Sequence, residues 1–213
     1  MSHYLIVQYP YEIIEIALCY ENNILQSYVL HKFQAVGQTI PTIQKLLQEN
    51  NLTLKDVVFI GVNVGPGPYN SLRALLTMMN GIHHVLKIPL VALSALDLLD
   101  YEYRDISHLA ILKAHEQHVF YSIQTKTIKK QGSGPILELI KIINDQQENL
   151  LLVGNGVEKY YDILIKMCAS KILIIDPVVN FNTLQTLATQ ALNVYQKNNT
   201  QMNYLKPIYF ENF

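Results

Sequence analysis

The 213-residue sequence has few charged residues and no excess of either sign. Lys and Arg number 16, Asp and Glu number 17, and together they make up 15% of the chain. The formal net charge of −1 provides no electrostatic footprint for nucleic acid, because phosphate binding needs clustered cations. The densest basic group is Lys126, Lys129 and Lys130, which we interpret as a solvated turn.

Cysteine, tryptophan and long apolar runs are scarce as well. Tryptophan is absent, and Cys19 and Cys168 lie far apart without metal-type spacing, so we expect reduced thiols packed as small hydrophobes. The apolar run from Ile88 to Leu99 is interrupted and too short to span a bilayer. The N-terminal stretch MSHYLIVQYP has no cationic export signal. We expect a cytoplasmic protein with no membrane partner.

Half of the residues are hydrophobic, which predicts a well-filled core. Apolar periodicity and turn signals predict a first half with this order: strands Tyr4–Gln8, Ile13–Tyr20 and Ile24–Leu30, helix Gln38–Asn50, strand Val57–Val64, helix Ser71–Leu86, strand Leu90–Leu93 and a helical turn Ser94–Leu99. The second half is predicted as strands His108–Ala114 and Val119–Thr125, helix Ile136–Asp145, strand Leu150–Val153, helix Val157–Met167, strand Ile172–Ile175 and helix Leu184–Tyr195.

The order of strands, helix, strand and helix thus occurs twice, which we interpret as an architectural duplication. The predicted boundary lies near Tyr101–Ser107, giving an N-terminal lobe of residues 1–103 and a C-terminal lobe of residues 104–213. Strands followed by α/β units indicate an α/β protein with two mixed-sheet lobes, as in the actin-like ATPase and ribonuclease H-like folds.

The stretch VNVGPGPYNSLRALL carries a glycine-rich loop between a strand and a helix, as phosphate-binding loops do. Pro66 and Pro68, however, have no backbone N–H to offer an anion. Neither the lysine of a P-loop nor the third glycine of a dinucleotide fingerprint is present. A helix N-terminus still attracts anions weakly, but we interpret Gly65-Pro66-Gly67-Pro68 as a rigid elbow that aims the following helix.

ATP chemistry in this fold would need carboxylates at strand ends to hold magnesium. The first strand ends in Gln8, and the strand opening the second lobe ends near Lys113. Of the seven aspartates, only Asp176 follows a predicted strand, and Pro177 after it indicates a turn. The sequence therefore predicts no catalytic nucleotide site.

GPGPYNSLR, residues Gly65 to Arg73, resembles the GPGSFTGLR signature of the TsaB (YeaZ) family, in the same strand-to-helix setting and followed by IPLVALSALDLL. Weaker similarities span most of the chain: His108–Tyr121, VGNG at Val153–Gly156, and Pro207-Ile208-Tyr209. The family's signature-loop positions fall on Gly65, Pro66, Gly67 and Arg73.

The resemblance implies an actin-like fold without a working ATPase site, in a non-catalytic subunit for threonylcarbamoyl modification of the adenosine beside the tRNA anticodon. It implies pairing with a TsaD-like catalytic paralogue through N-terminal helices, and a TsaE-like ATPase in the assembly. It further implies a homodimer when the chain is alone, and tRNA contact only through the complex. ATP and threonylcarbamoyl-adenylate would be used elsewhere in the pathway, with no cofactor bound by this chain.

The sequence departs from the family pattern at several positions. Gln8 replaces an aspartate, Pro68-Tyr69-Asn70-Ser71 replaces Ser-Phe-Thr-Gly, and Lys113-Ala114-His115 replaces Asp-Ala-Arg. His118 stands where glutamate is common, and Phe210-Glu211 replaces Leu-Arg. These changes weaken nucleotide or anion contact and leave a packing role intact.

The helix after the loop is apolar over most of its circumference. One stripe is Leu72, Leu75, Met79, Ile82 and Leu86, and a second on nearly the opposite side is Ala74, Met78, Gly81 and Val85. Such a helix is either enclosed in its own lobe or shared with a partner. Because the family resemblance implies pairing, we expect the second stripe to be the partner interface. Arg73 either pairs with a carboxylate there or is solvated.

His115, Glu116 and His118 lack the H-E-x-x-H spacing of a zinc site, and strand residues three apart face opposite sides. Cys19 and Cys168 have no evident base. We expect no metal site and no catalytic residue. The primary hypothesis is a non-catalytic scaffold for a TsaD-like transferase. The alternatives are an active phosphotransferase or peptidase-like hydrolase of the same fold, and a degenerate homodimer with an unrelated partner.

Overall fold

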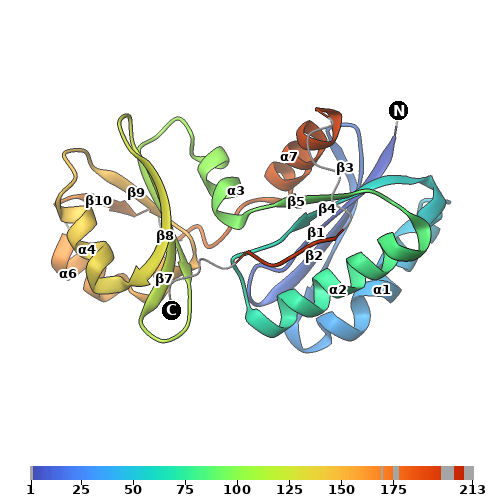
Figure 1. The fold of residues 1–213 in the computed structure, drawn as a ribbon, viewed down its shortest axis with the longest axis horizontal. Coiled ribbons are helices and arrows are strands. Elements are labelled where there is room, and N and C mark those ends of the chain that lie inside the picture. The colour runs from blue at the N-terminus through green and yellow to red at the C-terminus, as the bar shows by residue number, and fades with distance from the viewer. Residues whose placement is uncertain (1, 169, 175–177, 198–203, 209–213) are drawn as a thin grey trace. The chain divides into compact units, whose positions relative to one another are not determined.

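The computed structural model describes residues 2–168, 170–174, 178–197 and 204–208 (Figure 1). These residues form two compact units. Unit 1 is made of the described residues within Met1–Ser94 and Thr183–Ile208, and unit 2 of those within Ala95–Asn182.

Unit 1 is built on a five-stranded mixed sheet in the order β3-β2-β1-β4-β5. β1, β2 and β3 pair antiparallel, and β4 and β5 add parallel to β1. The strands are β1 (His3–Gln8), β2 (Ile13–Tyr20), β3 (Asn23–His31), β4 (Val57–Asn63) and β5 (Leu90–Leu93), and a short 3-10 turn, Leu54–Asp56, precedes β4.

Helices cover both faces of this sheet. α1 (Lys32–Glu49) and α2 (Tyr69–Leu86) lie on one face, and α7 (Leu184–Gln196) lies on the other (Figure 1). The near-continuous apolar sequence of β4 follows from this arrangement, because a strand buried on both faces has no solvated side for polar residues. α1 begins at Lys32, earlier than the predicted Gln38, and continues through Pro41.

Unit 2 repeats the same topology. Its sheet has the order β8-β7-β6-β9-β10. Read from this end, β8, β7, β6, β9 and β10 take the places of β3, β2, β1, β4 and β5 in unit 1. The strands are β6 (His108–Lys113), β7 (His118–Gln124), β8 (Lys129–Pro135), β9 (Leu150–Val153) and β10 (Ile172–Ile174), and the helices are α3 (Ala95–Glu102), α4 (Ile136–Asn144), α5 (Asn155–Lys159) and α6 (Tyr161–Cys168). Two mixed sheets with the same strand order confirm the predicted α/β architecture and its duplication.

The compact units differ from the predicted ranges 1–103 and 104–213 at two helices. α3, which the prediction placed at the end of the first lobe, packs on β6 and β7 of unit 2. α7, predicted in the second lobe, packs on the unit 1 sheet, where an added Cβ at Gly61 would lie 2.6 Å from Ala191 Cβ. Chain order assigned these helices to the wrong sheets, because sequence pattern does not say which apolar surface a helix covers.

β8 was not predicted, since KKQGSGP has the composition of a turn. It forms the edge strand beside β7, where Lys129 and Lys130 are exposed. An added Cβ at Gly132 would lie 2.9 Å from the Tyr121 hydroxyl oxygen, so the glycine leaves room for that ring. Pairing with β7 overrides poor strand propensity here.

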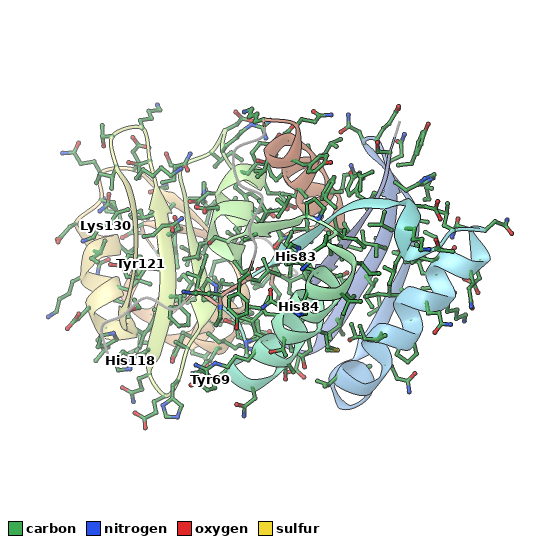
Figure 2. All side chains as sticks on the ribbon, turned by 45° about the vertical axis from the view of Figure 1, so that its right-hand side comes forward. Tyr69, His83, His84, His118, Tyr121 and Lys130 are labelled. Atoms are coloured by element: carbon green, nitrogen blue, oxygen red, sulfur yellow. The ribbon has the colours of Figure 1, made fainter. Side chains whose placement is uncertain are left out.

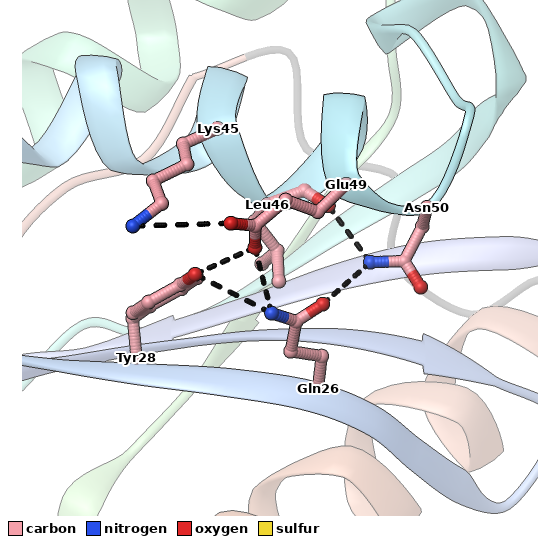
Figure 3. Close-up of polar contacts among 6 residues, drawn as sticks. All are labelled: Gln26, Tyr28, Lys45, Leu46, Glu49 and Asn50. Atoms are coloured by element: carbon pink, nitrogen blue, oxygen red, sulfur yellow. Dashed lines mark hydrogen bonds and ion pairs between the residues drawn. The ribbon is translucent and has the colours of Figure 1, made fainter.

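A polar network fastens the end of α1 to the edge strand β3 (Figure 3). The Tyr28 hydroxyl and the Gln26 amide donate to Glu49 Oε2 at 2.6 and 2.8 Å, and Asn50 donates to Gln26 Oε1 at 2.7 Å. The Lys45 ammonium lies 3.8 Å from Glu49 Oε1. Because hydrogen bonds stabilise its ionised form, the pKa of Glu49 is lowered, with Tyr28 contributing most.

Candidate partner interface and signature loop

The GPGP loop is an elbow between β4 and α2. Gly65 has a φ of +100°, a conformation that residues with a side chain rarely adopt, and its N–H donates to Asn63 Oδ1 at 3.0 Å. Pro68 precedes the first helical residue without a side-chain cap, and Leu72 N–H donates to its carbonyl at 2.9 Å. The helix therefore begins at Tyr69, two residues before the predicted start.

This geometry leaves few donors for an anion. Pro66 and Pro68 have no N–H, and the N–H of Gly65 is bonded within the loop. The structure holds the loop by contacts of its own chain, as an elbow requires. That the loop binds no phosphate stays a prediction.

A chain of polar side chains lies at the carboxyl ends of β1 and β4. Gln8 is fully buried, donates to Glu15 Oε2 at 2.6 Å, and accepts from Asn63 Nδ2 at 3.5 Å. Burial raises the pKa of Glu15, and the hydrogen bond from Gln8 opposes that rise.

Glu15 is a carboxylate that the sequence analysis missed. It comes from β2 and lies opposite Gln8 in the strand register. Its only sequence signal is a single acid within the apolar run IIEIALC. In the described part of the chain, no group of three or more His, Cys, Asp or Glu side chains is arranged to hold a metal ion. Asp176 and Pro177, the one predicted strand-end acid and the residue after it, lie outside the described residues.

The corresponding strand end of unit 2 carries Lys113. Its N–H donates to the buried Asn155 Oδ1 at 2.8 Å, and its ammonium lies 4.0 Å from Glu158 Oε2. His115 and Glu116 lie in the exposed β6–β7 turn, where the His115 ring and the Glu116 carboxylate are 3.7 Å apart. His118 begins β7, where Figure 2 labels it.

Both cysteines are free and buried, as predicted. Burial raises the pKa of Cys19 to about 12 and also raises that of Cys168. A thiol with a raised pKa forms little thiolate, so neither residue is a suitable nucleophile.

The structure separates the two apolar stripes of α2. The first packs into the core of unit 1, where Leu72, Leu75 and Met79 are fully or almost fully buried. The second stripe is more exposed. Ala74 and Met78 are half-buried, Gly81 has nothing within 4 Å of an added Cβ, and Val85 is 75% exposed.

Further exposed apolar side chains lie on α2 and on its neighbour α1. Tyr69 and Leu86 are exposed at the two ends of α2, and Val36 and Ile40 are exposed on α1. The exposure of Val36 and Ile40 was not predicted, because the predicted helix began at Gln38 and a partner face was expected only on α2. The signal was available in the spacing, since residues four apart share a helix face.

Arg73 has a partner that the sequence analysis did not consider. Its guanidinium carbon lies 3.9 Å from the centroid of the Tyr69 ring, one helical turn earlier. At the other end of α2, the His83 ring nitrogen Nδ1 lies 2.8 Å from the Ile88 carbonyl. Figure 2 labels Tyr69 at the start of the helix and His83 and His84 at its end.

Comparisons with known proteins bear on these features. Residues 35–133 match the family model described as TsaD, tRNA N6-adenosine threonylcarbamoyltransferase. Two relatives named tRNA threonylcarbamoyladenosine biosynthesis protein TsaB come from Buchnera aphidicola. The protein from B. aphidicola subsp. Schizaphis graminum is 28% identical to this chain, over 56% of this chain and 62% of its own length. The protein from B. aphidicola subsp. Baizongia pistaciae is 24% identical, over 80% of each chain.

Solved structures share the whole fold. YeaZ from Pseudomonas aeruginosa superposes with a TM-score of 0.73 and 18% identity, covering 99% of this chain and all of that one. The chain is therefore similar to proteins named TsaB in sequence and to YeaZ in fold. Its fold is the actin-like one, since the ethanolamine utilization protein EutJ from Carboxydothermus hydrogenoformans also superposes, with a TM-score of 0.53 and 11% identity over 90% of both chains.

The chain spans less than two thirds of the S. graminum relative in their alignment. None of the described helices is long and apolar enough to cross a membrane.

Proposed function

We propose that this chain is a non-catalytic subunit in tRNA threonylcarbamoyladenosine biosynthesis, and that it pairs with a TsaD-like transferase through α2. The names of its relatives support the pathway. The observation that carries the pairing is the second stripe of α2, in which Gly81 and Val85 are exposed. Ala74 and Met78 of this stripe are half-buried, and Met78 also packs against the core, whereas Leu72, Leu75 and Met79 of the first stripe are buried.

The match to the transferase family model supports the choice of partner. It covers residues 35–133, which include most of α1 and all of α2. Two chains that share this part of a fold can present similar helices to each other, as the two halves of an isologous dimer do. The small residues Ala74 and Gly81 allow a close approach between helices, and Met78 adapts to an irregular surface.

The residues at the ends of β1 and β6 support a non-catalytic role. Gln8 occupies the end of β1 and is engaged by Glu15 and Asn63, and the end of β6 carries Lys113. Neither residue can hold magnesium as an aspartate would. We further propose that the chain acts in the cytoplasm, binds no cofactor, meets a TsaE-like ATPase and tRNA only in the complex, and pairs with itself when the transferase is absent.

Co-purification with the organism's own TsaD-like protein tests this proposal, followed by a tRNA modification assay with and without this chain. Val85→Glu is the sharpest variant, because a residue 75% exposed can be charged without disturbing the core. We expect at least a tenfold loss of affinity, since a buried unpaired charge costs more than about 1.4 kcal/mol. Val29→Glu, at an exposed valine on β3, is the matched control and should bind normally.

A transferase that forms no complex with this chain and works equally well alone would contradict the proposal. Tight magnesium–ATP binding by the isolated chain would instead favour an active phosphotransferase or hydrolase of the same fold. Calorimetry on the purified chain separates these outcomes.

A further inference from the structure

A short segment near the C-terminus, Tyr204–Ile208, is hydrogen-bonded to α2 about two thirds of the way along the helix. The Asn80 side chain donates from Nδ2 to the Leu205 carbonyl at 3.0 Å and accepts the Leu205 N–H on Oδ1 at 2.7 Å. One amide thus satisfies both backbone groups of one residue, as a neighbouring strand would. The red segment at the end of the colour scale runs alongside α2 in Figure 1.

The same segment is also fixed at the elbow. Ile208 N–H donates to the Val64 carbonyl at 2.9 Å, one residue before Gly65. An added Cβ at Gly65 would lie 3.5 Å from the Ile208 carbonyl oxygen. Leu205 is 1% exposed within the unit 1 core, and Ile208 packs against that core. We call Tyr204–Ile208 the strap.

The position of α2 depends on contacts with other segments, because interactions within the helix stabilise it only weakly. It has no side-chain cap and no acid in its first turn. Gly81 lies in its interior, and the Thr77 hydroxyl donates to the Arg73 carbonyl, a local bond that competes with regular helix geometry. Tertiary contacts therefore decide where the helix lies.

We propose that the strap is a positioning element for the partner interface, and that Asn80 is the residue through which it sets α2. By helical spacing, Asn80 lies on a flank of the helix, between the buried stripe and the outward stripe that holds Ala74 and Val85. The strap would thus fix the helix without covering the interface. Only the identity of the partner rests on the proposed function.

The test uses three variants of the full chain. Asn80→Ala removes both bonds to the strap and leaves the backbone groups of the largely buried Leu205 without that partner. Asn80→Asp keeps an acceptor for the Leu205 N–H but sets a carboxylate oxygen against the Leu205 carbonyl, so it should lose at least as much. Thr77→Ala, three residues earlier on the same helix, is the matched control because its hydroxyl bonds only within α2 in the contact described above.

Hydrogen exchange of the unbound chain is the first measurement. In Asn80→Ala, peptides from α2 and the strap should exchange about tenfold faster, while unit 2 peptides keep their rates. Thr77→Ala should leave the strap peptides unchanged. Unaltered exchange of α2 in Asn80→Ala would overturn the proposal, whether or not a partner binds.

Titration with the TsaD-like protein is the second measurement. Weaker binding by Asn80→Ala and Asn80→Asp than by the wild type and Thr77→Ala supports the strap as a positioning element. Faster exchange with unchanged affinity would overturn its link to docking. If the wild type itself fails to bind, the proposed function fails, while the exchange data still decide whether the strap holds α2.

Discussion

The elbow after β4 and the elbow after β9 occupy the same place in two sheets of the same topology, yet they lead to different helices. Each has a glycine at positive φ, Gly65 at +100° and Gly154 at +96°. After Gly65 the chain forms the 18-residue helix α2 with an exposed apolar stripe. After Gly154 it forms α5, only five residues long, followed by α6.

In unit 2, the segment after Gly154 is hydrogen-bonded to the end of β6 and to the turn that follows it. Asn155 accepts from the Lys113 N–H, and the Lys159 ammonium and the Tyr160 hydroxyl both donate to the Glu116 carbonyl. The outward stripe of α2 consists instead of apolar residues, of which Gly81 and Val85 are exposed. The same place in the topology is thus tied by hydrogen bonds in unit 2, whereas in unit 1 it leads to a helix with an exposed apolar stripe.

α3 and α7, the two helices that pack on the other unit from the one predicted, are held by different contacts. α3 is held by buried polar groups, and removing them should have the largest effect of the series. Asp100 of α3 is buried with the fully buried His108, whose Nε2 lies 3.1 Å from Asp100 Oδ1, and Ser122 donates to Asp100 Oδ2 at 2.7 Å. Asp100→Ala leaves these groups without their partner and should destabilise unit 2 by about 3–5 kcal/mol. Urea denaturation followed by hydrogen exchange of unit 2 peptides measures it.

The control for that variant is Asp97→Ala, on the exposed side of the same helix, where the Gln131 amide donates to Asp97 Oδ1. It should cost less than about 1 kcal/mol. Equal effects of the two substitutions would mean that the buried polar group does not hold α3.

The two elbows can be compared directly by adding one methyl group. At Gly154 an added Cβ would lie 2.3 Å from the Ile111 carbonyl oxygen, and the φ is positive, so Gly154→Ala should cost about 3 kcal/mol. At Gly65 the nearest atom is the mobile end of Leu72, and Gly65→Ala should cost about 1–2 kcal/mol.

Gly67→Ala is the control for both elbows, because its nearest contacts would be at 3.7 Å and the cost should stay within about 0.5 kcal/mol. Chemical denaturation midpoints give all three values. A Gly154 variant no less stable than the Gly67 variant would contradict the tighter packing inferred for unit 2.

The next largest loss of stability is expected where α7 closely approaches the unit 1 sheet. Gly61→Ala would place a Cβ 2.6 Å from Ala191 Cβ and should cost about 1–3 kcal/mol. Adding Ala191→Gly in a double variant should recover part of the loss, since the clash is removed. A double-mutant cycle with no coupling would show that α7 does not press on β4 at this point.

Two glutamates of unit 1 should show pH effects of opposite sign, the smallest of the series. The pKa of Glu15 is raised from 4.5 by burial, so its contribution to stability is fully present below 4.5 and is lost as pH rises through the raised value. The pKa of Glu49 is lowered from 4.5 by hydrogen bonds from Tyr28 and Gln26, so its contribution is present above 4.5 and is lost as pH falls through the lowered value.

Glu15→Gln should therefore stabilise the chain at neutral pH, and Glu49→Gln should destabilise it slightly. Both differences should shrink as the pH falls. Side-chain NMR titration of the wild type checks the directions, and a Glu15 pKa below that of Glu49 would contradict them.

Much of the fold could be read from local pattern. The continuous apolar run of β4 predicted a strand buried on both faces, and the repeated element order predicted two sheets of one topology. The outward stripe of α2 could also be predicted, since helical spacing separates Ala74 and Val85 from Leu72 and Leu75. Glu15, Val36 and Ile40 escaped because their significance depends on which strand or helix lies beside them.

The sequence by itself determined most of the helices and strands, the duplication and the two faces of α2, because these follow from periodicity and turn chemistry within short windows. Only the tertiary structure decided that α7 covers the unit 1 sheet, that α3 covers strands of unit 2, and that KKQGSGP is a strand. The physical reason is that an apolar face specifies burial but not the surface against which it is buried. Long-range contacts such as Gly61 with Ala191 and Asp100 with His108 and Ser122 settle that choice.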